Sequence, residues 1–178
     1  MTNSRSGKDD VSILDIQLDR EDFSIELIAS LSETLQDVLG MDEASGIISV
    51  VGQKIGDHIN HKYLSALRLK TLPKQLLAQI LIDLKNRIQG KFYLIYEDND
   101  KIILGNDACP FAEKINGKPS LCMITSNVFG RICADNLGYA KVDIEKNLAQ
   151  GDSSCRVVIY LSQTEEGSDS IGNEYFGG

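Results

Sequence analysis

The chain has no tryptophan, few aromatic residues and a shortage of basic side chains. Its 18 Lys and Arg oppose 26 Asp and Glu, which gives 178 residues a net charge of −8. A nucleic-acid groove needs a basic stripe to neutralise phosphates, so we expect no nucleic-acid partner. No run approaches the ~20 apolar residues of a membrane span, so we expect no membrane partner either.

Residues Met1–Asp10 are polar, so we expect no export signal there. We therefore expect a cytoplasmic protein. The four cysteines all lie in the C-terminal half, and they are too few for a disulfide framework in a domain of this size. Metal binding or redox chemistry is the better interpretation of them. They are Cys109, Cys122, Cys133 and Cys155.

The hydrophobic content of 42% is enough for one domain with a substantial core. We expect residues 1–20 to form a flexible N-terminal arm, residues 21–162 a single α+β domain and residues 163–178 a disordered acidic tail. The tail has acidic residues but no Lys or Arg, and it lacks an apolar period. Its Tyr175 and Phe176 are either a docking handle for a partner or part of an ordinary ragged end.

Apolar periodicity predicts three helices followed by strands. The helices are expected over about 24–39, from 42 towards 69, and after Pro73 as far as Gly90. Two hairpins follow, one from 91–96 and 101–104, the other from 140–145 and 155–161, with a helix over about 121–137 between them. The pattern indicates an α+β fold in which the N-terminal helices pack on a small antiparallel sheet.

The second helix carries a row of small residues, Ser45, Ser49, Gly52 and Gly56, beside its apolar stripe. An interior glycine costs about 1 kcal/mol relative to alanine, so close approach by another helix should offset the cost. Packing within the chain and a homodimer interface would each account for the row.

Three of the cysteines lie at the ends of predicted elements. Cys122 follows Ser120, the expected N-cap of its helix, where the positive end of the helix dipole should favour a thiolate. Cys109 precedes Pro110 in a loop, and Cys155 opens the last strand. We identify these three as candidate metal ligands. The fourth ligand would be a carboxylate, Asn147 or water, and the competing interpretation is three buried or idle thiols.

Cys133 lies eleven residues after Cys122, which places it ~16 Å away along a continuous helix. Two ligands of one zinc ion must lie within ~4 Å of each other, so these two residues cannot share an ion. Cys133 falls in the apolar stripe of the helix and is expected to be a core thiol.

No catalytic constellation is present. His58 and His61 have a spacing that can chelate, but they lie in a polar stretch without an H-E-x-x-H pattern, so a solvated face is expected. The sequence has no G-x-S-x-G, phosphate loop or dinucleotide fingerprint. Nothing assembles a nucleophile, a base and an orienting group, so we expect no enzyme and no catalytic residue.

Several motifs resemble a known family over about residues 24–161. They are Cys109-Pro110-Phe111, Leu121-Cys122, Asn136-Leu137-Gly138-Tyr139-Ala140 and Gly151-Asp152-x-x-Cys155. They are similar to the methanogen output domain, a prokaryotic signalling module, and more distantly to 4-vinyl-reductase-type ligand-binding domains.

This resemblance implies the α+β ligand-binding fold of the NO-signalling and vesicle-transport type. It also implies a homodimer that senses or relays signals, often beside histidine kinases, and the helix with Gly52 and Gly56 fits the dimer-forming helix of the broader group. The 4-vinyl-reductase-type relatives hold structural zinc near this edge, and Cys122 and Cys155 match that pattern. Asn147 stands where relatives often have another cysteine, and Cys109 would take the place of that missing ligand.

The expected function is therefore a non-enzymatic, homodimeric sensor or relay domain in prokaryotic signal transduction. It would use Cys109, Cys122 and Cys155 as a zinc or redox site, beside an apolar ligand pocket between hairpins and helices. The alternative is a 4-vinyl-reductase-type enzyme or a carrier of a tetrapyrrole or heterocycle that uses Cys122. A haem sensor with His58 or His61 as axial ligand is a third hypothesis.

Overall fold

The structure is a computed structural model that describes residues 15, 19–109, 111 and 121–178. Most of the expected N-terminal arm, residues 1–20, lies outside this range. Three helices come first, α1 (Arg20–Leu39), α2 (Met41–Leu67) and α3 (Lys74–Asn86). Then follow β1 (Phe92–Glu97), β2 (Lys101–Asn106), α4 (Cys122–Leu137), β3 (Tyr139–Lys146), the short 3-10 helix η4 (Leu148–Gln150), β4 (Cys155–Tyr160), α5 (Glu165–Asp169) and β5 (Asn173–Phe176).

The five strands form one antiparallel sheet in the order β1-β2-β4-β3-β5. Both predicted hairpins are present, as β1–β2 and β3–β4. They are joined through β2 and β4, whose register sets Asn106 opposite Cys155 and Lys101 opposite Tyr160. The α+β expectation of helices on a small antiparallel sheet is confirmed.

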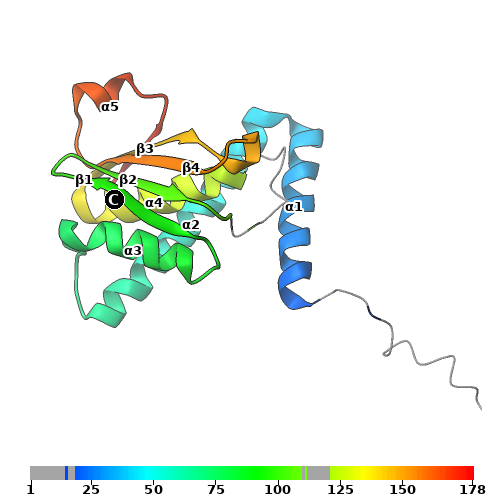
Figure 1. Ribbon diagram of the computed structural model, residues 1–178, viewed down its shortest axis with the longest axis horizontal. Coiled ribbons are helices and arrows are strands. Elements are labelled where there is room, and N and C mark those ends of the chain that lie inside the picture. Colours follow the sequence, from blue (N-terminus) through cyan, green and yellow to red (C-terminus); the bar gives the residue numbers. More distant parts are fainter. Residues whose placement is uncertain (1–14, 16–18, 110, 112–120) are drawn as a thin grey trace, which may run out of the picture.

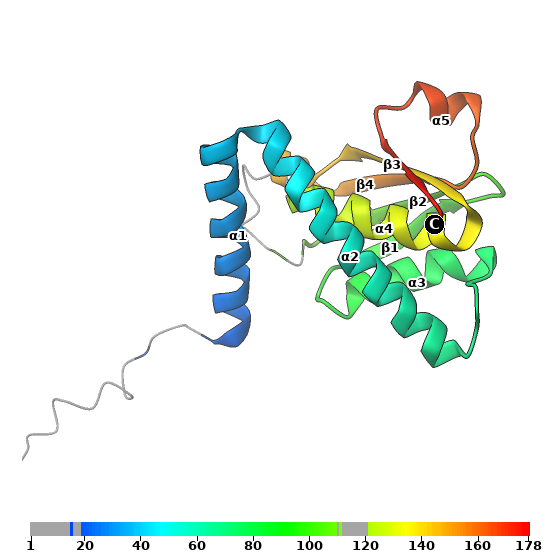
Figure 2. The same ribbon diagram turned by 180° about the vertical axis from the view of Figure 1, so that it is seen from behind.

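The main core lies between one face of the sheet and the helices α3 and α4, and α2 packs on α4 (Figures 1 and 2). Phe129 and Ile132 of α4 and Ile102 and Ile159 of the central strands have no exposed surface. The short α5 lies over the opposite face, where Ile103, Val158 and Tyr160 form a second cluster. The helix α4 is therefore covered by the sheet and by other helices.

The glycine row of α2 faces α4. A Cβ atom added at Gly52 would lie 2.7 Å from Cβ of Asn127, and one at Gly56 would lie 2.9 Å from Cβ of Arg131. Such distances are closer than side chains tolerate, so glycine is what lets the two helices approach. Packing within the chain accounts for the row, and the homodimer expected through this helix stays a prediction.

The expectation of a disordered tail over 163–178 is wrong. The segment forms α5 and then β5, which pairs with the edge strand β3, and Tyr175 is only 7% exposed. The ring of Tyr175 lies over Gly130 of α4, and its hydroxyl is 2.9 Å from Ser126 Oγ. Composition missed this order because the strand and the aromatic pocket that stabilise the segment come from elsewhere in the chain.

The first helix stands to one side of the body and packs chiefly on α2 (Figures 1 and 2). Its N-terminus is capped by Asp19, whose carboxylate accepts a hydrogen bond from the backbone N–H of Asp22 at 2.9 Å. Within the described ranges, no helix combines the length and the apolar character needed to cross a bilayer.

Candidate cysteine site

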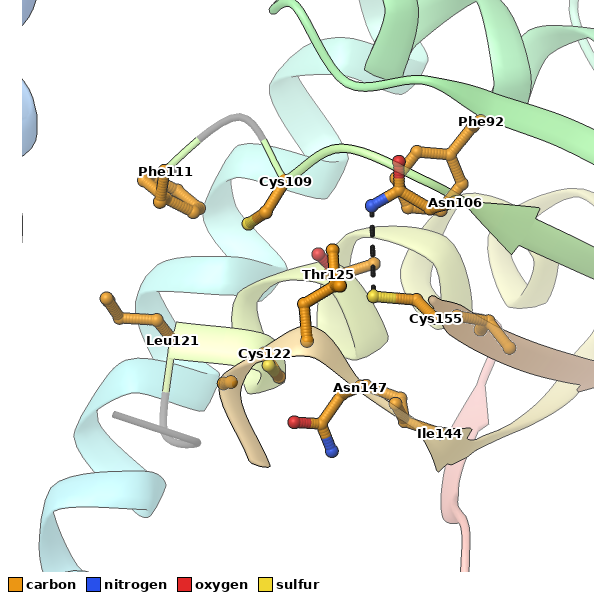
Figure 3. A pocket seen from close by; sticks show the side chains of 13 residues that line it. Phe92, Asn106, Cys109, Phe111, Leu121, Cys122, Thr125, Ile144, Asn147 and Cys155 are labelled. Carbon is orange, nitrogen blue, oxygen red and sulfur yellow. Dashed lines mark hydrogen bonds between the residues drawn. The ribbon is translucent and has the colours of Figure 1, made fainter. Parts of the chain in front are cut away.

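Three cysteines, one from a loop, one from a helix and one from a strand, line one small cavity at one end of the sheet (Figure 3). Cys109 follows β2, Cys122 is the first residue of α4 and Cys155 is the first residue of β4. The cavity has a volume of about 30 Å³, which is room for a water molecule or a single ion. The other lining residues are Phe92, Asn106, Phe111, Leu121, Thr125, Ile144, Asn147, Leu148, Ala149 and Val157.

The buried Asn106 organises the strand end that carries two of the cysteines. Its side-chain oxygen accepts hydrogen bonds from the backbone N–H groups of Lys91, at 3.1 Å, and Ala108, at 3.2 Å. Its amide donates to Cys155 Sγ at 3.8 Å. The bond to Ala108 is an Asx turn, so the Gly-Asn-Asp stretch signals this turn in the sequence. Asn106 thus fixes both the start of the Cys109 loop and the position of Cys155.

Cys122 does not have the thiolate character expected of it. The residue before it, Leu121, occupies the cap position of α4 without a side-chain cap, and Ser120 lies outside the described residues. Burial raises the pKa of the Cys122 thiol to about 12, with further contributions from Cys155 and Cys109. Because burial disfavours the charged thiolate, the prediction of a lowered pKa is wrong.

Sequence reasoning missed Lys85 of α3, a buried cation beside the thiols. Its side chain is 4% exposed, and its ammonium donates a hydrogen bond to Thr125 Oγ1 at 2.7 Å. The same nitrogen lies 5.6 Å from the ring centre of Phe92 and 5.3 Å from that of Phe129. The signal in the sequence is a lysine within the apolar stripe of a helix, four residues after the buried Leu81.

Burial lowers the pKa of Lys85 to about 8, while the thiols of Cys109, Cys122 and Cys155 oppose that shift. Within the described part of the chain, no carboxylate makes an ion pair with Lys85. A buried charge without a counter-charge is costly, and a thiolate is the anion closest at hand. The ammonium of Lys85 lowers the pKa of the Cys122 thiol, but burial raises that pKa by more, so Lys85 offsets only part of the cost of an anionic cysteine cluster.

The three thiols have the chemistry that zinc prefers, but their arrangement is not that of a metal site. Thiolates suit zinc, and a buried ammonium offsets their excess negative charge. Among residues 15, 19–109, 111 and 121–178, however, no three His, Cys, Asp or Glu side chains are gathered as a metal site requires. Asn147, an expected fourth ligand, uses both ends of its amide to cap η4 through Gln150, at 3.0 Å each.

The remaining cysteine and the histidines lie away from the cavity. Cys133 has no exposed surface, which confirms the expected core thiol, and burial raises its pKa to about 12. His58 and His61 are exposed on α2, as expected for a solvated face.

Several hollows in the described part of the chain are larger than the cysteine cavity, and two of them bear on ligand binding or on Cys122. An open groove of about 460 Å³ between α2 and α3 is lined by apolar residues such as Ile59 and Leu84 and by Tyr63. The hydroxyl of Tyr63 donates to Asp83 at 2.5 Å, and burial raises the pKa of Tyr63 to about 12. Another hollow, of about 390 Å³, lies on the outer side of Cys122, beside the turn before β5.

Residues 27–160 match the family model of methanogen output domain 1, which spans well over half of the chain. The chain belongs to this family. No curated protein matches this methanogen output domain.

Solved structures that share the fold of this domain at low identity include a sensory domain and a trafficking subunit. One is the phenol-responsive sensory domain of the transcription activator PoxR with phenol. It has 13% identity and a TM-score of 0.59, covering 81% of this chain and 78% of the other. The second is trafficking protein particle complex subunit 3 from Naegleria fowleri covalently bound to palmitic acid. It has 14% identity and a TM-score of 0.52, covering 80% of this chain and 97% of the other.

Proposed function

We propose that this methanogen output domain is a non-enzymatic sensor or relay domain that binds one zinc ion at Cys109, Cys122 and Cys155. The observation that carries the proposal is that these three thiols, distant in sequence, line one ion-sized cavity beside the buried Lys85. The methanogen output domain family and the fold shared with the PoxR sensory domain both support a sensory or output role.

Charge balance supports a metal at this place. Three thiolates on one zinc ion carry a net charge of about −1, and the ammonium of Lys85 cancels it. Without such a centre, the buried ammonium has only the Thr125 hydroxyl and two aromatic faces as partners among the described residues. Lys85 would thus hold the anionic centre in place as an outer-shell partner.

Cavity size argues against an organic signal at the cysteines. A cavity of about 150 Å³ is what holds a benzene ring, whereas this one has about 30 Å³. Phenol, which the PoxR domain holds, and palmitic acid, which the trafficking subunit holds, both exceed that space. An organic ligand, if the domain takes one, would use the groove between α2 and α3.

The helix α4 offers a route from the cavity to the surface. Its first turn carries Cys122 and Thr125, and its next turns bond α2 through Asn127 to Ser49, at 3.1 Å, and Arg131 to Asp57, at 2.6 Å. Drawing Cys122 onto an ion would shift this turn against α2 and β5. A histidine kinase or another signalling protein would read the change.

Metal analysis of the full chain, purified anaerobically, tests the proposal. We expect close to one zinc per chain and loss of the ion in the Cys109→Ser, Cys122→Ser and Cys155→Ser proteins. Cys133→Ala is the matched control, because it removes a thiol that lies in the core and should leave zinc in place. Wild-type protein without bound metal that also fails to take up added zinc would refute the proposal.

The Lys85→Met protein tests whether Lys85 supports metal binding or only stabilises the fold. Loss of an outer-shell partner lowers metal affinity by roughly 10–100-fold. We expect that decrease in a competition titration against a zinc chelator, with a circular dichroism spectrum like that of the wild type. An unchanged zinc affinity would remove Lys85 from the proposal.

A redox switch is the second candidate, because the thiols share a cavity but are not gathered around an ion position. Two thiols would lose two protons and two electrons to a peroxide, forming one disulfide while the peroxide is reduced to water. The raised pKa of Cys122 disfavours this candidate, and the reductase-type alternative with it, since the thiolate is the reactive form. Intact mass after peroxide treatment distinguishes a disulfide from unchanged thiols.

A further inference from the structure

The open groove between α2 and α3, the α2–α3 groove, has an apolar floor. The residues that line it come from one face of α2 and from the end of α3 with the turn after it: Ile59, Lys62, Tyr63, Ala66, Leu84, Arg87 and Ile88. The four on α2 have the spacing i, i+3, i+4 and i+7, so they lie on one side of that helix. Ile88 is 49% exposed, so the floor has apolar surface that the described chain leaves uncovered.

A hydrogen bond between the two helices fixes the width of the groove. The hydroxyl of Tyr63 donates to Asp83 at 2.5 Å, and the same carboxylate accepts from Arg87 Nε at 2.7 Å. Burial and Asp83 raise the pKa of Tyr63 to about 12, so its hydroxyl keeps the proton that it donates. The groove is therefore formed in advance, and a partner need not open it.

The open flank of α2 beside the groove is basic, although the chain as a whole has a net charge of −8. At 100° per residue, Lys54, His58 and Lys62 fall within roughly 80° of one another. All three side chains are exposed, and none of them forms a salt bridge with a described residue. From residue 44 to residue 82 the only acid is Asp57, which pairs with Arg131 of α4 at 2.6 Å.

We propose that the α2–α3 groove binds an acidic amphipathic helix of a partner protein. Apolar side chains at i, i+3 or i+4, and i+7 of such a helix span ~10 Å, which is the distance along α2 from Ile59 to Ala66. Acidic side chains beside them would meet Lys62 and His58 on one rim. On the other rim they would meet Arg87, whose side chain is 71% exposed.

Shape and charge favour a helix over other occupants. A bilayer surface does not reach the floor of a groove, and a chain with a net charge of −8 repels nucleic acid. A small organic molecule would contact the floor, whereas an acidic helix also accounts for the basic flank. The inference goes beyond the zinc proposal and is independent of it, because no residue of the groove lines the cysteine cavity.

Fluorescence anisotropy of a labelled synthetic peptide tests the inference on the full chain. The probe is a helical peptide of about four turns with Leu at i, i+3, i+4 and i+7 and Glu on its polar face. A comparison peptide has Lys in place of Glu. We expect saturable binding of the Glu peptide that added salt weakens, and an affinity for the Lys peptide that is lower by about tenfold or more.

Substitutions at two exposed residues locate the binding. Ile88→Glu should lower the affinity for the Glu peptide by about tenfold or more. The matched control Ile171→Glu adds the same charge at a residue that is 95% exposed elsewhere, and it should leave the affinity unchanged. Lys62→Glu should weaken binding of the Glu peptide and strengthen binding of the Lys peptide, whereas Lys146→Glu, at another exposed lysine, should do neither.

Folded wild-type protein that shows no saturable binding of the Glu peptide overturns the inference. So does binding that neither Ile88→Glu nor Lys62→Glu weakens. If Ile88→Glu loses its helical circular dichroism spectrum, Ile88→Ser replaces it, with the same expected direction. Light scattering gives the mass of each variant, and a lower mass for the Ile88 variant than for the wild type would show that a second copy covers the groove, which also overturns the inference.

Discussion

Lys85 is a single residue that lies on the buried face of its helix and also belongs to the candidate cysteine site. It occupies the buried face of α3 with Leu77, Leu81 and Leu84, where an apolar side chain would be expected. The protein instead places an ammonium against two aromatic rings and a hydroxyl, beside three thiols. Burying a charge is unfavourable unless something compensates, so the residue points to chemistry at the cavity.

The pH dependence of stability should reveal this buried amine. Lys85 has a pKa of about 8 in the folded chain against an ordinary 10.5, so between those pH values only the unfolded chain binds the proton. The free energy of unfolding should therefore rise from pH 8 to 10.5, by on the order of 3 kcal/mol, and Lys85→Met should lack this rise. Urea unfolding of both metal-free, reduced proteins measures it.

The comparison with Lys85→Met is needed because the thiols act in the opposite direction. Burial raises the pKa values of Cys122 and Cys133, so the folded chain retains protons that the unfolded chain loses above about pH 9. Both proteins share that loss, and the difference between them isolates Lys85. Parallel pH profiles for the two proteins would contradict the assignment of a buried, titrating lysine.

At the scale of elements, the contact between α2 and α4 determines which small residues matter. Gly52 lies where α4 approaches most closely, whereas a Cβ atom added at Gly46 of the same helix would meet nothing within 4 Å. The two glycines look alike in sequence, because both interrupt an apolar helix. Only the position of α4 distinguishes them.

We expect opposite signs of stability change for alanine at these two glycines. Gly52→Ala should lower the free energy of unfolding by about 1–3 kcal/mol, because the added methyl group forces the helices apart. Gly46→Ala should raise it by about 0.5–1 kcal/mol, since alanine favours the helix and nothing is displaced. Thermal unfolding of both variants checks this, and a stabilised Gly52→Ala would contradict the packing described.

The C-terminal strand offers a second comparison between neighbours. Tyr175→Ala should cost about 3 kcal/mol, because it empties a buried aromatic site over Gly130 and leaves Ser126 without its partner. Phe176→Ala should cost under about 1 kcal/mol, since Phe176 is 58% exposed. Urea unfolding measures both. Equal effects of the two substitutions would show that β5 is not docked on α4.

At the scale of the whole molecule, α4 connects the cysteine cavity, the helical layer and the C-terminal segment. The turn before β5, with Ile171 and Gly172, lines the hollow on the outer side of Cys122. The tail therefore covers one approach to the thiols, although it begins more than forty residues after Cys122 in the sequence. Ligand access at the cysteines and docking of the tail should be coupled.

Removal of the segment after Ser162 should expose Cys122. We expect alkylation of Cys122 by iodoacetamide to become several-fold faster, because the residues on the open side of that hollow are gone. Cys133 serves as the internal control, since it has no exposed surface and should stay unreactive while the core is intact. Peptide mass spectrometry follows both sites, and an unchanged rate at Cys122 would contradict the coupling.

Local patterns were sufficient for the elements whose stabilising contacts are near in sequence. The i+4 stripes predicted α1 to α4, and polar turns between apolar runs predicted both hairpins, because helix and hairpin contacts recur at fixed short spacings. The same reasoning failed for β5, because its four residues are too few to show an apolar period. Its backbone partner is the edge of β3 and its aromatic pocket is on α4, so nothing local records its order.

For the candidate site, helix geometry alone separated Cys133 from the other three cysteines, because residues eleven apart on a helix lie ~16 Å from each other. It could not tell that burial would raise the pKa of Cys122 or that Lys85 would lie beside it. Both depend on which surfaces exclude water, and that is determined by the packing of α3 and α4 on the sheet.

The sequence by itself determined the α+β class, the helices, the two hairpins and the three cysteines at their ends. These follow from local periodicity and the steric preferences of the chain. Only the tertiary structure decided that the three cysteines share a cavity with Lys85, that α4 occupies the glycine row and that the tail completes the sheet. Those facts are long-range contacts, and their free energy comes from burial and from hydrogen bonds between segments far apart along the chain.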